Sequence, residues 1–325
     1  MVSVLLPYRD AEDTIARALA SVLAEDVVRE VVAIDDGSRD QGFSRVQSMQ
    51  DARIVHVRTE GAGVAGALRE GLRHARGDLI ARMDADDVSR PGRIAASVAM
   101  LERDASIAVA ACQVDLAGAV TEGMRTYVDW QNAIVTRDAH ARAMFVESPV
   151  CHPATTIRRS ALEAVGGFRD APWAEDWDLW LRLDAAGFGF AKIPEPMLAW
   201  HQHDKNATRR DPRCSIDRLR EARATYLAPR LASMQRPVAM WGAGPTGKRL
   251  ARELERHGVR TSRFIDIDPR KIGRVRRGVP VIDRRHVDRE HTIVVAVGAR
   301  GARDLVRADL EGRGFVEGTD FIAAA

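Results

Sequence analysis

Three carboxylates lie within four residues at Asp84-Ala85-Asp86-Asp87, directly after an apolar, strand-like run. Like charges at this density repel one another, so ordering them costs free energy unless a cation or several hydrogen-bond donors neutralise them. Carboxylate oxygens suit Mg²⁺ or Mn²⁺, which is often shared with the phosphates of a substrate. The alternative is structural, because Asp87 or Ser89 could cap a helix that starts near Pro91. From these residues alone, both interpretations stay open.

A second acidic cluster, Asp35-Asp36-Gly37-Ser38, follows another strand-like run. An Asx turn with a glycine is the common structural explanation for such a segment. If both runs are strands of one parallel sheet, their carboxyl ends share an edge, and such sheets bind ligands outside that edge. Two acidic clusters there favour a nucleotide-diphosphate site with a bound cation.

A carboxylate pair, Glu175-Asp176, opens a predicted helix between Trp173 and Trp177. An apolar wall raises the pKa of a carboxylate and a helix N-terminus lowers it, so the pair could supply a general base. The alternative is an N-terminal capping cluster, since Asp and Glu favour the first helical turn. Taken alone, these residues favour the capping interpretation.

Histidines occur near the end of the same region, in His201-Gln202-His203, followed by Thr208-Arg209. A histidine there could bind a metal ion, and the arginine could contact a phosphate. A polar surface loop explains the same residues equally well.

The C-terminal third carries a glycine pattern, Gly242-x-Gly244-x-x-Gly247, between a strand-like run and a predicted helix. With Asp266 at the end of the next strand-like run, this is the dinucleotide fingerprint in its expected context. The segment is short for a full dinucleotide fold and shows no catalytic pair for hydride transfer. We therefore keep two interpretations: a structural, regulatory or assembly role, or the binding of NAD(P), another nucleotide or a nucleotide sugar.

Alternating strand-like and helix-like segments must position these clusters. Strand-like runs lie at residues 2–6, 27–34, 54–57, 79–83, 107–114 and 154–157. Helical spacing of apolar residues lies at 11–23, 64–75, 91–102, 160–165, 175–186 and 216–231. Residues 117–150 are unassigned, and residues 194–213 are predicted to be a loop region. This order predicts an α/β fold with a doubly wound, mostly parallel sheet.

A second, smaller α/β unit of Rossmann-like pattern is predicted after Pro237. Its strand-like runs lie at residues 238–241, 262–267, 292–297 and 320–324, and its predicted helices at 248–257 and 302–313.

Composition limits the class of protein. The chain has 325 residues, of which 46% are hydrophobic and 29% charged, as in a globular protein of one large or two ordinary domains. The net charge is +3 and no polybasic block lies beside aromatic residues, so nucleic-acid binding is not expected. No apolar run approaches the length of a membrane-spanning helix, and the first residues do not read as a signal peptide. With three scattered cysteines, we expect a cytoplasmic protein.

Five segments together resemble, in order and spacing, the family 2 glycosyltransferases of the GT-A fold. They are VSVLLPYRDAE (2–12), IDDGSRD (34–40), ARMDADDVSRPGR (81–93), residues 166–183 and residues 200–209. The resemblance covers residues 1 to about 225 and is greatest to bacterial enzymes that build cell-surface polysaccharides. It implies a metal-dependent, inverting transfer of a sugar from a nucleotide-diphosphate sugar to a hydroxyl group of a glycan or lipid-linked acceptor. A lipid-linked acceptor would require peripheral contact with the membrane or a partner.

The resemblance implies roles for individual residues on the donor side. Those that would line the nucleobase pocket are Pro7, Tyr8, Arg9, Glu12 and Asp36. Those that would lie near the ribose and diphosphate are Arg82 and Asp84, with Thr208 and Arg209 closing a loop over the diphosphate. Asp86 would coordinate Mn²⁺ or Mg²⁺ beside Asp87, and His203 would be a further ligand of the metal or diphosphate.

On the acceptor side, the resemblance implies that Asp176 is the base that deprotonates the acceptor hydroxyl, with Glu175 as the alternative. His152-Pro153 and Gly166-Gly167 would shape that side. The sequence departs from the family pattern at Asp10, where asparagine is frequent, and at His201, where arginine is frequent.

Residues from about 237 to 325 resemble the small Rossmann-like domains attached to bacterial sugar-modifying enzymes, through the run FIDIDPRKIG (264–273). The expected organisation is a GT-A domain at 1–225, a linker at 226–236 and an accessory domain at 237–325. The alternative function is a sugar-modifying enzyme that binds NAD(P) or a nucleotide sugar through the C-terminal domain. The sequence lacks a Tyr-x-x-x-Lys pair, which argues against hydride transfer. A non-catalytic nucleotide-sugar sensor would need neither Asp86, Asp176 nor His203.

Overall fold

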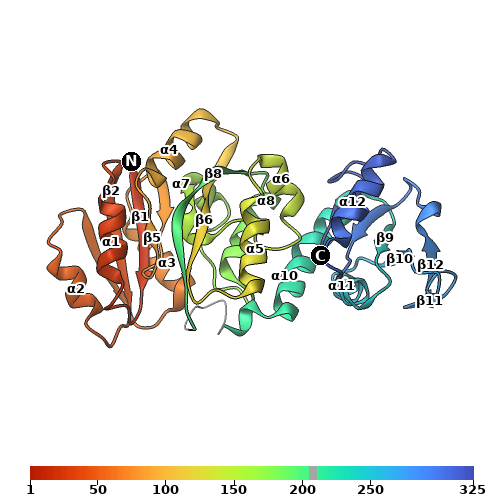
Figure 1. The fold of residues 1–325 in the computed structure, drawn as a ribbon, viewed down its shortest axis with the longest axis horizontal. Helices are drawn as coiled ribbons and strands as arrows, with labels where there is room; N and C mark the ends of the chain where they lie inside the picture. Colours follow the sequence, from red (N-terminus) through yellow and green to blue (C-terminus); the bar gives the residue numbers. More distant parts are fainter. Residues whose placement is uncertain (205–210) are drawn as a thin grey trace. The chain divides into compact units, whose positions relative to one another are not determined.

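A computed structural model describes residues 1–204 and 211–325 of the chain (Figure 1). It contains two compact units, one formed by residues 1–140 and 148–211 and the other by residues 141–147 and 212–325. Helix α10 (Ile216–Ser233) groups with the second unit, although its first half lies within the expected domain 1–225. The domain limits expected from the sequence stay a prediction, because a grouping by contacts does not show which segments fold together.

The first unit is built on a mixed sheet whose eight described strands have the order β3-β2-β1-β4-β7-β6-β8-β5 (Figure 1). The strands are β1 (Val2–Tyr8), β2 (Val28–Asp36), β3 (Ile54–Thr59), β4 (Leu79–Arg82), β5 (Val88–Ser89), β6 (Ile107–Gly118), β7 (Thr156–Arg158) and β8 (Gly189–Gln202). Strands β1 to β4 pair in parallel, and β7 runs antiparallel to both β4 and β6. The α/β fold with a mostly parallel sheet is therefore confirmed.

Most of the helices that connect these strands lie at the positions that the apolar spacing predicts. They are α1 (Ile15–Leu23), α2 (Gly42–Ser48), α3 (Gly63–His74), α4 (Arg93–Arg103), α5 (Glu122–Asn132), α6 (Arg137–Ala143), α7 (Arg159–Ala164) and α8 (Glu175–Ala185), with a 3₁₀ turn η1 (His152–Ala154). Helix α1 buries Ile15, Ala18, Leu19 and Val22, and burying each of the three larger side chains contributes about 1.5–3 kcal/mol. Helix α2 has no counterpart in the prediction, and α5 and α6 fill the unassigned region.

The predicted loop over residues 194–213 is wrong in its first part. Strand β8 continues to Gln202 and pairs in parallel with β6, and a short 3₁₀ turn, η2 (Pro212–Cys214), follows later. Pro194 and Pro196 suggested a loop because proline cannot donate a hydrogen bond to a sheet ladder. The structure accommodates them with register shifts around Gln113 of β6, a bulge-like irregularity. The strand thereby carries His201 to the end of the sheet.

The second unit contains a smaller sheet with the described strand order β11-β12-β10-β9-β13-β14. Its strands are β9 (Val238–Trp241), β10 (Thr261–Asp266), β11 (Val275–Arg276), β12 (Val279–Asp283), β13 (Thr292–Val295) and β14 (Phe321–Ala323). Its helices are α10, α11 (Pro245–Arg256) and α12 (Ala302–Gly312), with a 3₁₀ turn η3 (Arg284–His286). The pairings are parallel except that of β11 with β12, a short hairpin that the sequence did not predict.

Candidate active site

The acidic cluster of residues 84–87 directly follows β4, at the carboxyl end of the parallel strands. Asp84, Asp86 and Asp87 each offer an oxygen atom, and these atoms lie within 4.8 Å of one another. Asp87 is 1% exposed, and its Oδ2 has no hydrogen-bond partner among the described residues. A buried carboxylate oxygen without a donor is costly, so this set of oxygen ligands fits a divalent cation.

The pKa values of the cluster lead to the same conclusion. Burial raises the pKa of Asp87 well above its usual range, and the charges of Asp84 and Asp86 raise it further. Asp84 is partly exposed, yet the surrounding protein raises its pKa too, and the ion pair with Arg82 offsets part of that rise. A bound cation would favour the charged form of all three carboxylates.

The capping explanation for this cluster is excluded. Helix α4 begins at Arg93 after Gly92, and no side chain of its own N-cap residue bonds to it. The carboxylate of buried Glu25 accepts hydrogen bonds from the amides of Ile94 (3.1 Å) and Ala95 (3.0 Å) instead. Asp87 is left to accept a bond from the backbone N–H of His201 at 2.8 Å.

Strand β8 brings the two predicted histidines to this cluster from more than a hundred residues away in the sequence. Nε2 of His203 lies 2.7 Å from Oδ2 of Asp86. The ring of His201 instead lies against its own strand, with Nδ1 3.2 Å from the carbonyl oxygen of Ala199. His203 is therefore the histidine placed to share a metal ion with Asp86. The predicted contributors Thr208 and Arg209 lie outside the described residues.

Two buried arginines hold the acidic cluster in place. Arg82 donates to Oδ1 of Asp84 at 2.7 Å and to the carbonyl oxygen of Met83. Arg93 is fully buried and donates to Ser89 Oγ (2.7 Å) and to the carbonyl oxygen of Pro153 (2.8 Å). No role was predicted for this residue from the sequence. Arg93 thus connects the acidic segment to the His152-Pro153 turn. In the sequence, the only indication of a role for Arg93 was its position in the segment 81–93, which carries part of the family resemblance.

The predicted nucleobase residues lie where β1 ends beside β2. Pro7 pairs with Ile34, and Tyr8 with Asp35. The segment that follows is joined to residues 38–41 by four hydrogen bonds. They are Asp10 N–H to Ser38 Oγ (3.1 Å), Arg39 N–H to Asp10 Oδ1 (2.8 Å), Glu12 N–H to Asp40 Oδ2 (2.8 Å) and Gln41 N–H to Glu12 Oε2 (3.0 Å). Glu12 therefore already orders the neighbouring loop, whereas Arg9 is exposed beside Gly61.

The two carboxylates of the second acidic cluster have different surroundings. Asp36 accepts bonds from Thr59 Oγ1 (2.6 Å), Ala62 N–H (2.6 Å) and Gly63 N–H (3.0 Å), so it holds the start of α3. Asp35 is fully buried and makes the predicted Asx turn by accepting from the Ser38 N–H at 2.8 Å. Burial, and then the charge of Asp35, raise the pKa of Tyr8. The turn was therefore predicted, but only Asp36 was expected beside the nucleobase, although Asp35 is the carboxylate that acts on Tyr8.

The carboxylate pair opens α8, as predicted. Helix α8 follows Ala174, and no side chain of that N-cap residue bonds to it. Asp176 Oδ1 accepts from the Trp177 N–H at 2.7 Å, and Ser148 Oγ lies 3.4 Å from Oδ2. Although the side chain is partly accessible, the surrounding protein raises the pKa of Asp176 to about 6. Asp176 can therefore change its charge near neutral pH, as a general base must.

Glu175 has a different neighbour. Its Oε1 lies 3.9 Å from Nδ1 of His152, a buried ring that packs edge-on against Trp180. Burial lowers the pKa of His152 well below its usual range, so this histidine is neutral and gives Glu175 no cationic partner. His152 Nε2 has no hydrogen-bond partner among the described residues.

The sequence model of glycosyl transferase family 2 matches residues 3–166, which include both acidic clusters. The chain belongs to glycosyl transferase family 2. Members of this family invert the anomeric centre and depend on a metal ion. Asp176, His203 and residues 212–325 lie beyond the matched residues, so the family match says nothing about them.

Relatives and solved structures are consistent with this family. EpsE of Bacillus subtilis is 29% identical over 229 residues, which are 66% of this chain and 78% of EpsE. The Escherichia coli protein WfgD, a UDP-Glc:alpha-D-GlcNAc-diphosphoundecaprenol beta-1,3-glucosyltransferase, is 33% identical over 103 residues, 31% of this chain and 41% of WfgD. This family 2 glycosyltransferase is thus related to enzymes of bacterial polysaccharide biosynthesis that use nucleotide sugars.

Two solved structures resemble this one in fold. S. aureus TarS with UDP-GlcNAc has a TM-score of 0.59 at 15% identity, covering 79% of this chain and 72% of that one. The mannosyltransferase PcManGT of Pyrobaculum calidifontis, in complex with GDP-Man and Mn²⁺, has a TM-score of 0.50 at 23% identity, covering 71% and 63%. Both support a GT-A-like architecture. In the described part of this glycosyltransferase, no helix has the length and apolar character needed to cross a membrane.

The glycine fingerprint of the second unit shapes the turn between β9 and α11. A Cβ atom at Gly247 would lie 1.9 Å from the carbonyl oxygen of Gly242, so only glycine permits this close packing. A Cβ atom at Gly244 would meet nothing within 4 Å. Asp266, the acidic residue of the predicted fingerprint, accepts four bonds of 2.9–3.0 Å within the protein, two of them from Ala243 N–H and Lys271 Nζ. Its carboxylate is engaged by its own loop, which argues against a role in ribose binding.

Proposed function

We propose that this family 2 glycosyltransferase uses the site at the end of β4 to move a sugar from a nucleoside-diphosphate sugar to an acceptor hydroxyl group. The observation that carries the proposal is the unpartnered, buried oxygen of Asp87 beside Asp84, Asp86 and His203. A cluster of this kind is stable when a divalent cation balances its charge.

Asp86 and His203 would hold the cation, with Asp84 and Asp87 adjacent. Oxygen ligands and one imidazole suit Mn²⁺ and also accept Mg²⁺, and Mn²⁺ accompanies GDP-Man in the Pyrobaculum calidifontis neighbour. When bound, the cation neutralises the charge that grows on the departing nucleoside diphosphate. Arg82 keeps Asp84 oriented toward the same region through its 2.7 Å bond.

Asp176 would act as the base. Its Oδ2 takes the proton of the acceptor hydroxyl while the hydroxyl oxygen bonds to the anomeric carbon and the bond from that carbon to the diphosphate breaks. Attack from the face opposite the leaving group inverts the anomeric centre. A pKa of about 6 leaves the carboxylate ionised at neutral pH yet basic enough to accept the proton. Glu175, whose Oε1 lies 3.9 Å from Nδ1 of His152, is the alternative base.

The nucleobase would lie beside the end of β1, among Pro7, Tyr8, Arg9 and Asp36, with the ordered loop of Glu12 at its border. Hydrogen bonds between residues 10–12 and 38–41 already fix that wall before a ligand arrives. Such preorganisation lowers the entropic cost of binding. The relative WfgD is named for a diphosphoundecaprenol-linked acceptor, which supports a lipid-linked or glycan acceptor here.

The test is a transfer and donor-hydrolysis assay with a panel of UDP-, GDP- and dTDP-sugars, each with Mn²⁺, with Mg²⁺ and with EDTA. We expect turnover of one donor class that requires the cation and is lost in Asp86→Ala. The matched control is Asp170→Asn, an exposed carboxylate before α8, which should keep full activity. Failure to turn over any donor under every condition would overturn the proposal.

A further inference from the structure

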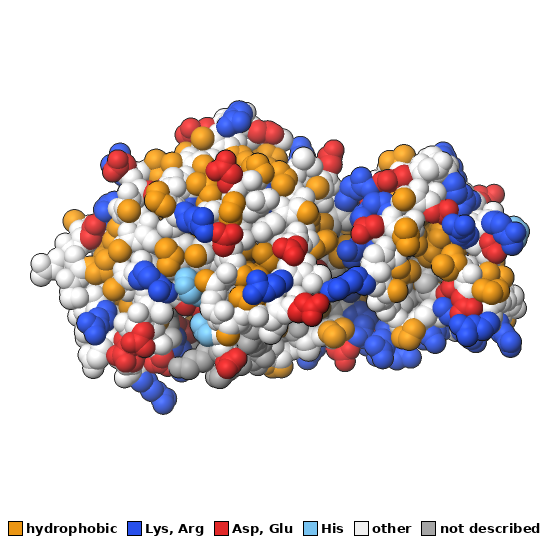
Figure 2. All heavy atoms as spheres, viewed as in Figure 1, with side chains coloured by type: hydrophobic (Ala, Val, Ile, Leu, Met, Phe, Trp, Pro, Cys, Tyr) orange, Lys and Arg blue, Asp and Glu red, His pale blue; other side chains and the backbone are white. Residues whose placement is uncertain are grey.

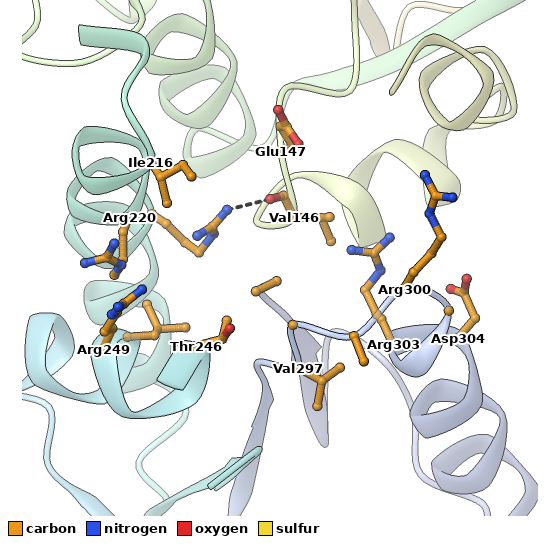
Figure 3. A pocket seen from close by; sticks show the side chains of 16 residues that line it. Val146, Glu147, Ile216, Arg220, Thr246, Arg249, Val297, Arg300, Arg303 and Asp304 are labelled. Atoms are coloured by element: carbon orange, nitrogen blue, oxygen red, sulfur yellow. Dashed lines mark hydrogen bonds between the residues drawn. The ribbon is translucent and has the colours of Figure 1, made fainter. Parts of the chain in front are cut away.

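A cavity of about 460 Å³ lies within the second unit, at the carboxyl ends of its parallel strands (Figure 3). Its walls come from α10, from the first turns of α11 after β9, and from the segment between β13 and α12. Strand β10, which follows β9 in the chain, pairs with one side of β9, and β13 pairs with its other side. The cavity therefore opens where the strand order reverses, which is where open α/β sheets bind ligands.

Positive charge dominates the walls of this cavity. Of the described lining side chains, five are arginines and two are carboxylates: Arg220, Arg223, Arg249, Arg300 and Arg303 against Glu147 and Asp304. Figure 3 shows Arg220 and Arg249 on one wall, with Arg300 and Arg303 on the opposite one. Figure 2 shows Lys and Arg side chains also gathered over the surface of this unit in that view. Guanidinium groups facing one another across a cavity suit an anion that several of them can contact.

These charges are only partly neutralised within the protein: Arg220 pairs with Asp217, and the charges of Glu147 and Asp304 act on Arg303. Arg223 is fixed by donating to the carbonyl oxygens of Phe145 and Val146, each at 2.6 Å. Burial lowers the pKa of Arg223 to about 10, and burial also lowers the pKa of Arg303. Glu147 lines the cavity and contacts solvent there, yet the surrounding protein raises its pKa. The structure gives no hydrogen bond or ion pair within the described residues to the guanidinium groups of Arg249 or Arg303.

Backbone groups add to the positive potential. Helices α11 and α12, of twelve and eleven residues, both begin at the cavity, so the partial positive charge of each N-terminus is directed to it. The turn before α11 is open at Gly244, where a phosphate could approach the backbone. On the cavity wall, a Cβ atom at Gly298 would lie 2.5 Å from Thr246 Oγ1. A glycine at this position therefore leaves room for the threonine hydroxyl group.

We propose that this cavity binds a diphosphate-bearing anion without a metal ion, at a site on the second unit that is separate from the donor site. The excess of arginines over side-chain carboxylates suits an anion with several negative charges, such as a diphosphate ester. The volume falls in the range of small-molecule sites and leaves room for a group attached to the diphosphate. The glycine turn then shapes the site, and the arginines supply the binding.

The experiment is calorimetric titration of the full chain with inorganic diphosphate in EDTA, in an Asp86→Ala background that removes the metal site of the first unit. The result is thus independent of whether the proposed transferase activity is correct. We expect saturable binding that weakens by about tenfold or more in R249Q/R303Q, since the two substitutions remove charge-assisted contacts to the diphosphate. The matched control is R252Q/R260Q, which removes two exposed arginines of the same unit outside the cavity and should retain the wild-type Kd.

Absence of saturable binding up to about 1 mM diphosphate would overturn the proposal. So would an equal loss in both double variants, because it would show attraction to the general charge of the unit. Competition then separates two sources of the group. Displacement by UDP at lower concentration than by inorganic diphosphate identifies a nucleotide ligand, and stronger displacement by geranyl diphosphate identifies a lipid diphosphate.

Discussion

The two units present opposite charges at equivalent places in their sheets. In the first, carboxylates follow β4 at the carboxyl end of the parallel strands, and His203 joins them. In the second, arginines surround a cavity at the carboxyl ends of β9 and β13. Both arrangements suit a diphosphate, but the first needs a cation to attract it and the second does so directly. Metal dependence should therefore distinguish the two units.

Removing the cation gives the largest expected effect. EDTA, or Asp86→Ala, should lower kcat/KM for sugar transfer by about a thousandfold or more, because the cation supplies several kcal/mol of charge stabilisation. Diphosphate binding to the second unit should be unchanged in the same sample. Steady-state assays and calorimetry on one protein preparation measure both.

If EDTA abolished diphosphate binding as well, the contrast between the two units would be wrong. If transfer continued at the full rate without a cation, the assignment of Asp86 and His203 would be wrong instead. His203→Ala should weaken the apparent affinity for Mn²⁺ and leave binding to the arginine-lined cavity intact.

Asp176→Asn should lower kcat by about a hundredfold to ten-thousandfold, since it removes a positioned general base. The asparagine keeps the shape of the side chain, so the Kd of the donor should stay at its wild-type value. Asp170→Asn is the control, and Glu175→Gln should have the smaller effect of the pair. If Asp176→Asn kept the full rate and Glu175→Gln were inactive, Glu175 would be the general base instead of Asp176.

The pH dependence of the transfer rate also tests whether Asp176 is the general base. Asp176 must be deprotonated to act, and burial raises its pKa to about 6. The rate should therefore fall about tenfold per unit as the pH drops below 6, and level off above it. Because the pKa of the folded state is raised, ionising Asp176 costs stability as the pH rises through 6. Asp176→Asn should accordingly gain in Tm over wild type at pH 8 but not at pH 4.

A profile that is flat between pH 5 and 8, the range in which a group with a pKa near 6 titrates, would contradict a base of this kind. Arginines stay charged throughout that range, so any change in diphosphate binding near pH 6 should follow the ionisation of the ligand's own phosphate groups. The two units then differ in pH dependence as well as in metal dependence.

The positions of the two acidic clusters could be predicted because each cluster directly follows its own strand in the sequence. Strand-like runs before Asp35 and before Asp84 indicate two parallel strands, and their carboxyl ends must meet at one edge. The sequence pattern could not show that Asp36 binds the start of α3 while Asp35 forms the turn. The apolar spacing predicted this helix at 64–75, close to its observed start at Gly63, but it could not show which of the two neighbouring carboxylates reaches the first amides of the helix.

His203 reaches Asp86 through strand β8, a segment that its prolines led us to predict as a loop. His203 was predicted as a ligand, but the segment leading to it was predicted to be a loop, and only the pairing of β8 with β6 fixes where it arrives. The arginine cavity had no signal at all, since Arg220, Arg249 and Arg303 come from three separate helices. A site assembled from single residues of distant elements leaves no spacing in the sequence to recognise.

The smallest expected effect tests what the glycine fingerprint does. Gly247→Ala should lower the free energy of unfolding by about 1–3 kcal/mol, because its Cβ would press on the backbone carbonyl of Gly242, which cannot move aside as a side chain could. Gly244→Ala is the matched control in the same turn, where a Cβ meets nothing and the stability should change little. Denaturant unfolding measures both. If Gly244→Ala were as destabilising as Gly247→Ala, packing would not explain the pattern. If Gly244→Ala keeps its stability but loses diphosphate binding, the ligand approaches this turn as well as the arginines.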